Sequence, residues 1–104
     1  MDEINGKFPA KQEFCELLDA TFRMRLTDGS GFDLSLVNFD DHVSNSAQEN
    51  FSLLFRAPGA APPFQGIYRL ENDRLGEMDL FLVPVKKDGD GLYYEAVFNN
   101  LVGQ

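Results

Sequence analysis

Two aspartates alternate with two glycines in the run Asp88-Gly-Asp-Gly91. Carboxylates at this spacing begin many calcium-binding loops, because calcium prefers several oxygen ligands. The run lacks the third acidic position and the distal bidentate glutamate that complete such a loop. Aspartate and glycine are also typical residues of tight turns. We therefore predict a solvent-exposed β-turn here, and we expect the chain to bind neither a metal ion nor a cofactor.

The only histidine follows two aspartates, in Asp40-Asp-His42. Histidine titrates near neutral pH and carboxylates can orient its ring, so this triplet could bind a metal ion or relay a proton. Three adjacent residues cannot all point to one position from a strand, because successive side chains alternate between its faces. The segment from Asp40 to Asn50 is polar, and we expect it to form an exposed loop.

The only thiol belongs to Cys15. A cysteine near the start of a helix can become acidic enough to act as a nucleophile. Here Lys11 is the only nearby cation, and no histidine lies near in the sequence. Because a free cysteine commonly packs as a small apolar side chain, we expect Cys15 to be buried and unreactive.

Four charged residues occupy outward positions of the later predicted strands: Arg69, Glu71, Asp79 and Glu95. They could form a carboxylate site on the outer face of a hairpin. Cross-strand ion pairing explains the same residues without a function, and we expect Arg69 to face Asp79. We therefore assign no catalytic residue and expect the protein not to be an enzyme.

The segment Pro58-Gly-Ala-Ala-Pro-Pro-Phe-Gln65 is too long for a tight hairpin and must cross one end of the structure. Its prolines stiffen it, and Phe64 is its only large apolar side chain. Phe64 could cap the core or stand exposed as an anchor for a partner. The possible partner-contact loop consists of Pro58, Pro62, Pro63 and Phe64.

These candidate residues depend on strands for their positions. Alternating apolar and polar residues predict six strands, at residues 21–27, 32–39, 51–57, 66–72, 77–85 and 93–99. An apolar stripe predicts one short helix over residues 10–18, and residues 1–8 are expected to be flexible. The pattern predicts an all-β single domain over residues 1–104, a small antiparallel six-stranded barrel or a strongly curled sandwich with one N-terminal helix. The alternative is an α+β roll.

The pattern also predicts details of two strand pairs. If the inward residues of the first hairpin share a face, Leu26 lies opposite Phe32 or Leu34, and the Phe32 register places Arg25 opposite Asp33. The run from Met78 to Val85 is apolar on both of its faces, and we expect both to be covered. Proline at position 84 belongs near a strand end or on an edge, because it cannot donate a ladder hydrogen bond.

The overall charge excludes one class of partner. Seventeen acidic residues and nine basic residues give a net charge of −8. A nucleic-acid partner requires clustered lysine and arginine to neutralise phosphates, so we expect no DNA or RNA binding. One cysteine is consistent with a reducing compartment. The sequence shows no secretion signal and no run of about 20 apolar residues, so we expect a cytoplasmic protein that does not enter a membrane.

Most of the chain resembles a family of small bacterial proteins of similar length, described only as a domain of unknown function. The resemblance is carried by Phe51-Ser-Leu-Leu-Phe-Arg-Ala-Pro58, Gln65-Gly-Ile-Tyr-Arg-Leu-Glu71, Leu75-Gly-Glu-Met-Asp-Leu-Phe-Leu-Val-Pro-Val85 and Tyr94-Glu-Ala-Val-Phe-Asn99. Ala57 stands where the family is expected to carry glycine. Genes of this family can lie near those of phage-tail-like collar proteins. The resemblance implies a one-domain bacterial protein, and it supplies no catalytic residue.

Two functions compete. The sparse polar candidates favour a non-catalytic binding or assembly module, accessory to a larger or phage-tail-like assembly, that binds a protein partner or itself. The alternative is a small-molecule-binding barrel or an enzyme that uses the barrel mouth, where ligand sites commonly form. Ten phenylalanines would fill much of a small interior, which argues against a roomy cavity.

Overall fold

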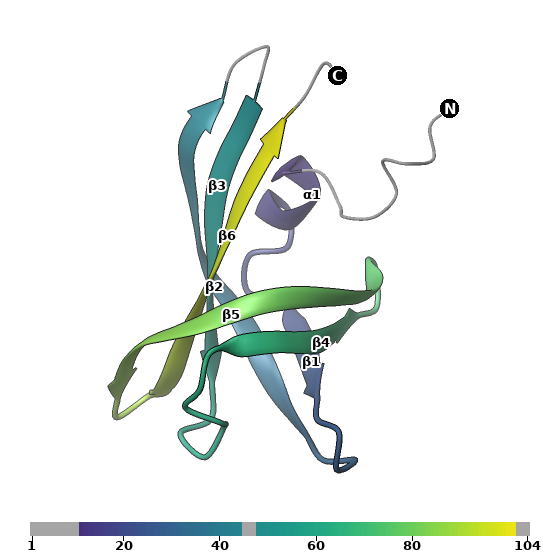
Figure 1. The fold of residues 1–104 in the computed structure, drawn as a ribbon, viewed down its shortest axis with the longest axis vertical. Coiled ribbons are helices and arrows are strands. Elements are labelled where there is room, and N and C mark those ends of the chain that lie inside the picture. Colours follow the sequence, from purple (N-terminus) through teal and green to yellow (C-terminus); the bar gives the residue numbers. More distant parts are fainter. Residues whose placement is uncertain (1–10, 45–47, 102–104) are drawn as a thin grey trace.

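Six antiparallel strands close into a barrel in the computed structural model, which describes residues 11–44 and 48–101 (Figure 1). The strand order around the barrel is β1-β2-β3-β6-β5-β4, and β4 returns to pair with β1. The elements are α1 (Lys11–Cys15), β1 (Thr21–Arg25), β2 (Gly31–Ser44), β3 (Gln48–Ala57), β4 (Gly66–Asn72), β5 (Gly76–Asp88) and β6 (Gly91–Leu101). The prediction of a small antiparallel barrel is confirmed, and the α+β roll is not observed.

The connection from β3 to β4 determines the topology. Strands β1, β2 and β3 follow one another as hairpins, and β4 then lies beside β1. This arrangement is a Greek key, in which the fourth strand returns by a longer connection to the first. Residues 58–65 make that connection, so the predicted contact loop spans one end of the barrel.

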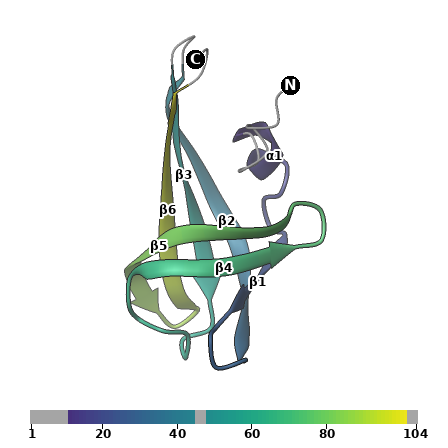
Figure 2. The ribbon, with the colours of Figure 1, turned by 45° about the vertical axis from the view of Figure 1, so that its right-hand side comes forward.

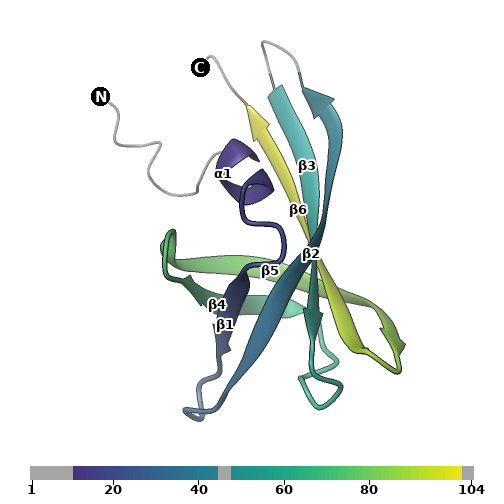
Figure 3. The same cartoon turned by 180° about the vertical axis from the view of Figure 1, so that it is seen from behind.

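Three strands continue past the barrel as an arm, made of residues 38–44 of β2, 48–54 of β3 and 96–101 of β6 (Figures 1 and 2). Helix α1 covers one face of this arm, as Figure 3 shows from behind. Phe14 of α1 lies 5.4 Å from Phe98 between ring centroids, and Phe51 stacks on Phe98 at 4.7 Å. Aromatic packing of this kind stabilises a helix that is too short to persist alone.

The arm corrects the prediction that residues from Asp40 to Asn50 form a polar loop. Strand β2 runs on to Ser44, and β3 begins at Gln48. The register shifts between Leu36 and Asn38 and again between Asp41 and Val43. These bulges break the alternation of apolar and polar residues. One face of the arm is also in contact with solvent and carries polar residues, so the sequence of this segment resembles that of a loop. Strands β5 and β6 are also longer than predicted.

The first hairpin is tighter than predicted. The Leu26 backbone N–H donates to the Ser30 carbonyl at 2.9 Å, and Gly29 between them has φ of +92°. Met24 therefore pairs with Phe32, so the prediction that Leu26 faces Phe32 or Leu34 is wrong. The same shift places Arg23, and not Arg25, opposite Asp33.

Helix α1 is shorter than the predicted helix over residues 10–18. It ends at Cys15, and four turn residues follow. Asp19 has a positive φ of 72°, a conformation that aspartate tolerates better than most residues. Its backbone N–H donates to the Leu36 carbonyl at 2.7 Å, which ties the end of this turn to β2.

Inward-facing side chains fill the barrel. Phe22 and Phe55 meet edge to face at 5.2 Å between centroids. The residues of the barrel that are fully buried are Phe22, Met24, Leu34, Leu36, Phe55, Leu70, Leu82 and Tyr94. The interior of the barrel is therefore a packed core.

Strand β5 is buried on one face only. Met78, Leu80 and Leu82 face the core, whereas Phe81 is 53% and Val85 50% exposed. The expectation that both faces are covered is wrong, because no element within residues 11–44 and 48–101 packs on the outside of this strand (Figure 2). Pro84 pairs with Tyr94 of β6 beside the bulge at Val85, and the register between β4 and β5 ends at Leu82. Among the described residues, Pro84 therefore lies on a free edge of β5, one of its two predicted positions.

Candidate contact surface

The loop of residues 58–65 is anchored to the barrel by a buried side chain. Ala61 is 2% exposed and belongs to the core. Its backbone N–H donates to the Pro58 carbonyl at 3.0 Å, which makes a turn at the start of the loop. The small side chain at position 61 thus fixes the middle of the loop to the end of the barrel.

Two tyrosines bind the second half of this loop. The hydroxyl of Tyr94 on β6 donates to the Pro62 carbonyl, and the hydroxyl of Tyr68 on β4 donates to the Phe64 carbonyl at 2.6 Å. The two rings lie 5.9 Å apart between centroids. Burial raises the pKa of Tyr94 to about 12 and also raises the pKa of Tyr68. Both hydroxyls therefore stay protonated and keep donating well above neutral pH.

The side chain of Phe64 points away from this attachment. Phe64 is 69% exposed, so it does not cap the core. Pro58 and Pro63 are exposed beside it, and Pro62 is half-buried. Of the two roles that the sequence left open for Phe64, the structure has the exposed one.

The outer face of the β4–β5 hairpin adds two more apolar side chains. Ile67 and Phe81 lie directly opposite each other in the strand register. They are 72% and 53% exposed. Ile67 follows Phe64 by three residues in the chain. The next residue of β4, Tyr68, donates a hydrogen bond to the Phe64 carbonyl. We name Phe64, Ile67 and Phe81 together the apolar patch.

The sequence contained a signal for Phe81 that the periodicity alone did not reveal. The predicted pairing of Arg69 with Asp79 is confirmed. In an antiparallel pair, that register requires Ile67 to face Phe81 on the same outer side. Following the ion pair along the hairpin by two residues would therefore have placed both side chains in solvent.

Charged residues cover the outer face of β2, β1, β4 and β5 next to the apolar patch. The register places like charges opposite each other, Arg25 against Arg69 and Glu71 against Glu77. The ion pairs avoid this conflict, partly by crossing diagonally between strands. The nitrogen-to-oxygen distances are 3.3 Å for Arg23–Asp33, 3.2 Å for Arg25–Glu71, 3.1 Å for Arg69–Glu77 and 2.6 Å for Arg69–Asp79.

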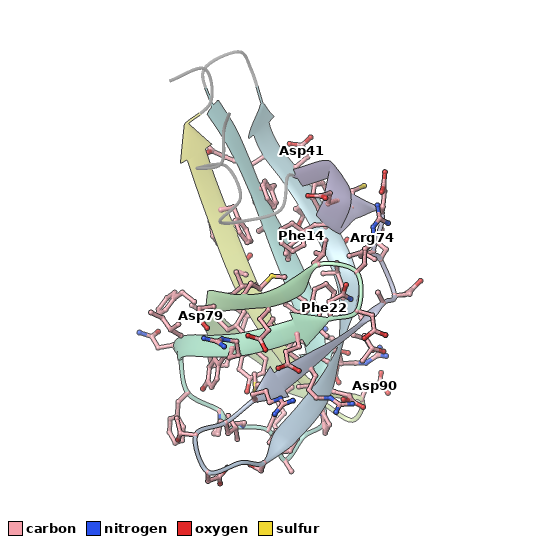
Figure 4. All side chains as sticks on the ribbon, turned by 90° about the vertical axis from the view of Figure 1, so that its right-hand side faces the viewer. Phe14, Phe22, Asp41, Arg74, Asp79 and Asp90 are labelled. Carbon is pink, nitrogen blue, oxygen red and sulfur yellow. The ribbon has the colours of Figure 1, made fainter. Side chains whose placement is uncertain are left out.

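Arg69 is the centre of this charged face, because it pairs with both Glu77 and Asp79. Figure 4 shows Asp79 on the β4–β5 hairpin. The hydrogen bond from Arg69 lowers the pKa of Asp79, and the same bond raises the pKa of Arg69. All these groups are accessible to water, so each pair contributes little to stability. Glu95 lies elsewhere, on β6 opposite Val83, so the four-residue carboxylate site considered from the sequence does not assemble.

A groove of about 560 Å³ lies along the charged face. Its lining residues are Thr21, Arg23, Arg25, Glu71, Asn72, Asp73, Gly76 and Glu77. Arg23 and Arg25 could attract an anion, but both already bind carboxylates. An anionic ligand would have to displace those carboxylates, so the groove offers weaker support for a function than the apolar patch.

The Asp40-Asp-His42 triplet lies in strand β2 and not in a loop. Nε2 of His42 and Oγ of Ser52 form a hydrogen bond of 2.9 Å across to β3. Ser52 is only 4% exposed, which leaves its hydroxyl little access to a substrate. The pair therefore fits a structural role between the two strands.

The remaining sequence candidates are also resolved. Asp88 accepts a hydrogen bond from the Asp90 backbone N–H at 2.8 Å, and residues 89–90 form the predicted turn. Cys15 is exposed, so the prediction that it is buried is wrong. Phe14, the residue before it, is fully buried in the core instead.

Within residues 11–44 and 48–101, no three histidine, cysteine, aspartate or glutamate side chains gather closely enough to hold a metal ion. The same part of the chain has no helix with the length and apolar character that crossing a membrane requires.

Comparison with known proteins gives one family. No curated protein and no solved structure matches the chain. The family described as "Domain of unknown function (DUF6916)" has a model that matches residues 9–98. The matched region includes the apolar patch, the charged face and the tyrosines that hold the loop. The chain therefore belongs to this family of domains of unknown function, as its resemblance predicted.

Proposed function

We propose that this domain is a non-catalytic binding module that docks a protein partner through the apolar patch. The observation that carries the proposal is the exposure of three large apolar side chains: the cross-strand pair Ile67 and Phe81, and Phe64 three residues before Ile67 in the chain. Single exposed apolar residues are ordinary, but adjacent ones on a monomer commonly mark an interaction surface. Aromatic side chains also supply much of the binding energy at protein interfaces.

The attachment of the loop supports the proposal. Phe64 extends from a segment whose neighbouring carbonyls are bound by Tyr94 and Tyr68. A side chain on a backbone that is already ordered loses less conformational entropy when a partner covers it. The barrel therefore presents Phe64 in a defined position before any partner binds.

The placement of the reactive side chains supports a role without catalysis. His42 lies in the arm, and Asp88 and Asp90 lie in the β5–β6 hairpin at the other end of the molecule (Figure 1). Cys15 lies on α1. A catalytic site needs such groups within hydrogen-bonding reach of one another. The alternative of a ligand in the barrel mouth has less support, because packed side chains occupy the interior.

The proposal extends to the setting of the module. We assign it to the bacterial cytoplasm, as an accessory of a larger or phage-tail-like assembly. The free cysteine is consistent with a reducing compartment. The net charge of −8 argues against nucleic acid as the partner and is compatible with an otherwise soluble surface.

Photo-crosslinking in the native host tests the proposal. A benzophenone amino acid replaces Phe64 in one variant and Phe81 in a second, and Asp28 in a control. Asp28 is exposed in the β1–β2 turn, away from the patch. We expect a discrete crosslinked product from positions 64 and 81, identified by mass spectrometry, and none from position 28. Equal crosslinking from all three positions, or none from the two patch positions, would contradict the proposal.

A further inference from the structure

We propose that the partner bound at the apolar patch is a second copy of this chain. Two barrels would pair face to face through their β4–β5 hairpins, around a two-fold axis. The inference rests on the proposed function and names its partner. Three properties of the patch support a second copy: its shape, its area and the charges around it.

The patch is built on a pair of strands that can stack on its own copy. Ile67 and Phe81 lie opposite each other and project from the same outer face of the hairpin. Packed sheets lie about 10 Å apart, and their facing side chains interdigitate. A two-fold axis through the Ile67–Phe81 pair therefore places each apolar side chain against those of the other copy.

The exposed area fits a small two-fold interface. Phe64, Ile67 and Phe81 are 69%, 72% and 53% exposed, which amounts to about 350 Å² for side chains of this size. A two-fold contact uses the patch twice and so buries about 700 Å² of apolar surface. Homodimer interfaces are about 65% apolar, so the whole interface would cover about 1,100 Å². This value lies just below the lower limit of stable specific interfaces, about 1,200 Å², and in the range of weak, transient ones, so we expect a weak dimer.

The charges beside the patch are compatible with self-pairing. Arg69 lies between the carboxylates of Asp79 and Glu77, so the border of the patch carries both signs. Such a border can place an arginine of one copy near a carboxylate of the other, whereas a border of one sign repels its own copy. Arg69 would instead repel a partner with a basic surface.

Sedimentation equilibrium of the full chain, in reducing buffer, tests the inference. We expect the average mass to rise from that of a monomer towards that of a dimer between about 10 µM and about 1 mM protein. The two copies repel each other at long range, since each has a net charge of −8. Salt screens this repulsion, so the dimer should strengthen as salt is added.

Matched variants locate the interface. Phe81→Glu and Ile67→Glu place a charge in the patch, and Leu18→Glu adds the same charge at a residue that is 45% exposed outside it. We expect the two patch variants to raise the dimer dissociation constant at least about tenfold, and the control to change it less than about twofold. Phe81→Ala should weaken the dimer in the same direction, and circular dichroism should show that each variant is folded.

The outcomes separate this inference from the proposed function. A chain that stays monomeric at about 1 mM, or a dimer that the patch variants leave unchanged, overturns the inference. If the chain is monomeric while position 64 crosslinks to a different protein in cells, the binding function stands and the partner is that protein. If the chain is monomeric and position 64 crosslinks to nothing, both the inference and the proposed function fail.

Discussion

Replacing Phe64 by alanine tests whether the residue belongs to the surface or to the core. Burying a phenylalanine completely contributes about 1.5–3 kcal/mol. Phe64 is 69% exposed, so only about a third of that contribution, about 0.5–1 kcal/mol, can be lost. No cavity forms, because the side chain projects into solvent. We therefore expect Phe64→Ala to lower the free energy of unfolding by less than about 1 kcal/mol.

Phe51→Ala is the matched control for this change. Phe51 is fully buried, and its ring centroid lies 4.7 Å from that of Phe98 and 5.5 Å from that of Phe39. Removing it leaves a cavity, so the expected loss is about 3–5 kcal/mol. Urea denaturation of both variants and the wild type, followed by circular dichroism, measures the two losses. A loss above about 2 kcal/mol for Phe64→Ala would show that the ring packs on the core and would refute the partner-contact loop.

Three further predictions concern Gly91, Tyr94 and Cys15. Gly91→Ala should lower the free energy of unfolding by more than about 2 kcal/mol, because Gly91 has φ of +143° and an added Cβ would overlap the Ala57 carbonyl. Gly66→Ala is the control, since its Cβ would meet no atom within 4 Å, and similar urea midpoints for the two variants would contradict the prediction. Tyr94 is favoured as the neutral phenol in the folded state, with its pKa raised from 10.0 to about 12, so stability should be lost as the pH rises through that window. Tyr94→Phe should reduce that loss in thermal melts, and an unchanged pH dependence would exclude the mechanism. Cys15 should react with a thiol reagent in the native protein almost as fast as in denaturant, since it is exposed; strong protection would contradict its placement.

The strand pattern predicted the barrel because its interior demands strict alternation. Phe22 and Met24, for example, face the core from β1, and Arg23 between them faces solvent. Such a pattern identifies which residues share a face, and the six strands with one helix leave few ways to bury them. The pattern of apolar and polar residues does not predict how many residues a turn contains. Gly29 closes the first turn early, and every pair of that hairpin shifts accordingly.

The arm shows a second limit of the pattern. One face of the arm is open to water and the other is covered by α1, and two bulges interrupt the alternation. Polar residues such as Asp40 and His42 therefore look like loop residues although they pair with β3. Helix α1 is responsible for the burial of Phe51 and Phe98 here. This packing joins segments far apart in the chain, which local periodicity cannot reveal.

The contact surface was only half visible in the sequence. Phe64 stood out because it is the one large apolar residue in a proline-rich loop, but its direction depends on Tyr94 and Tyr68, which lie in later strands. Phe81 looked buried because it lies in a continuous apolar run. Phe81 is exposed because no other element of the described residues forms a layer on the outside of β5, a property of the tertiary fold.

The contacts that hold residues 58–65 are more than a simple connection between two strands requires, and they fit the proposed binding role better. A connection across the end of a barrel can leave its carbonyls to water at little cost, since a water-bound carbonyl is satisfied. Here the core supplies Tyr94, which is fully buried, and its hydroxyl reaches the Pro62 carbonyl. Tyr68 binds the next part of the loop, and Ala61 anchors its middle. These contacts fix the backbone on both sides of Pro63, yet they leave Phe64 in solvent, where a free chain gains nothing from it. We expect a gain only when another surface covers that ring, as in the binding function proposed above.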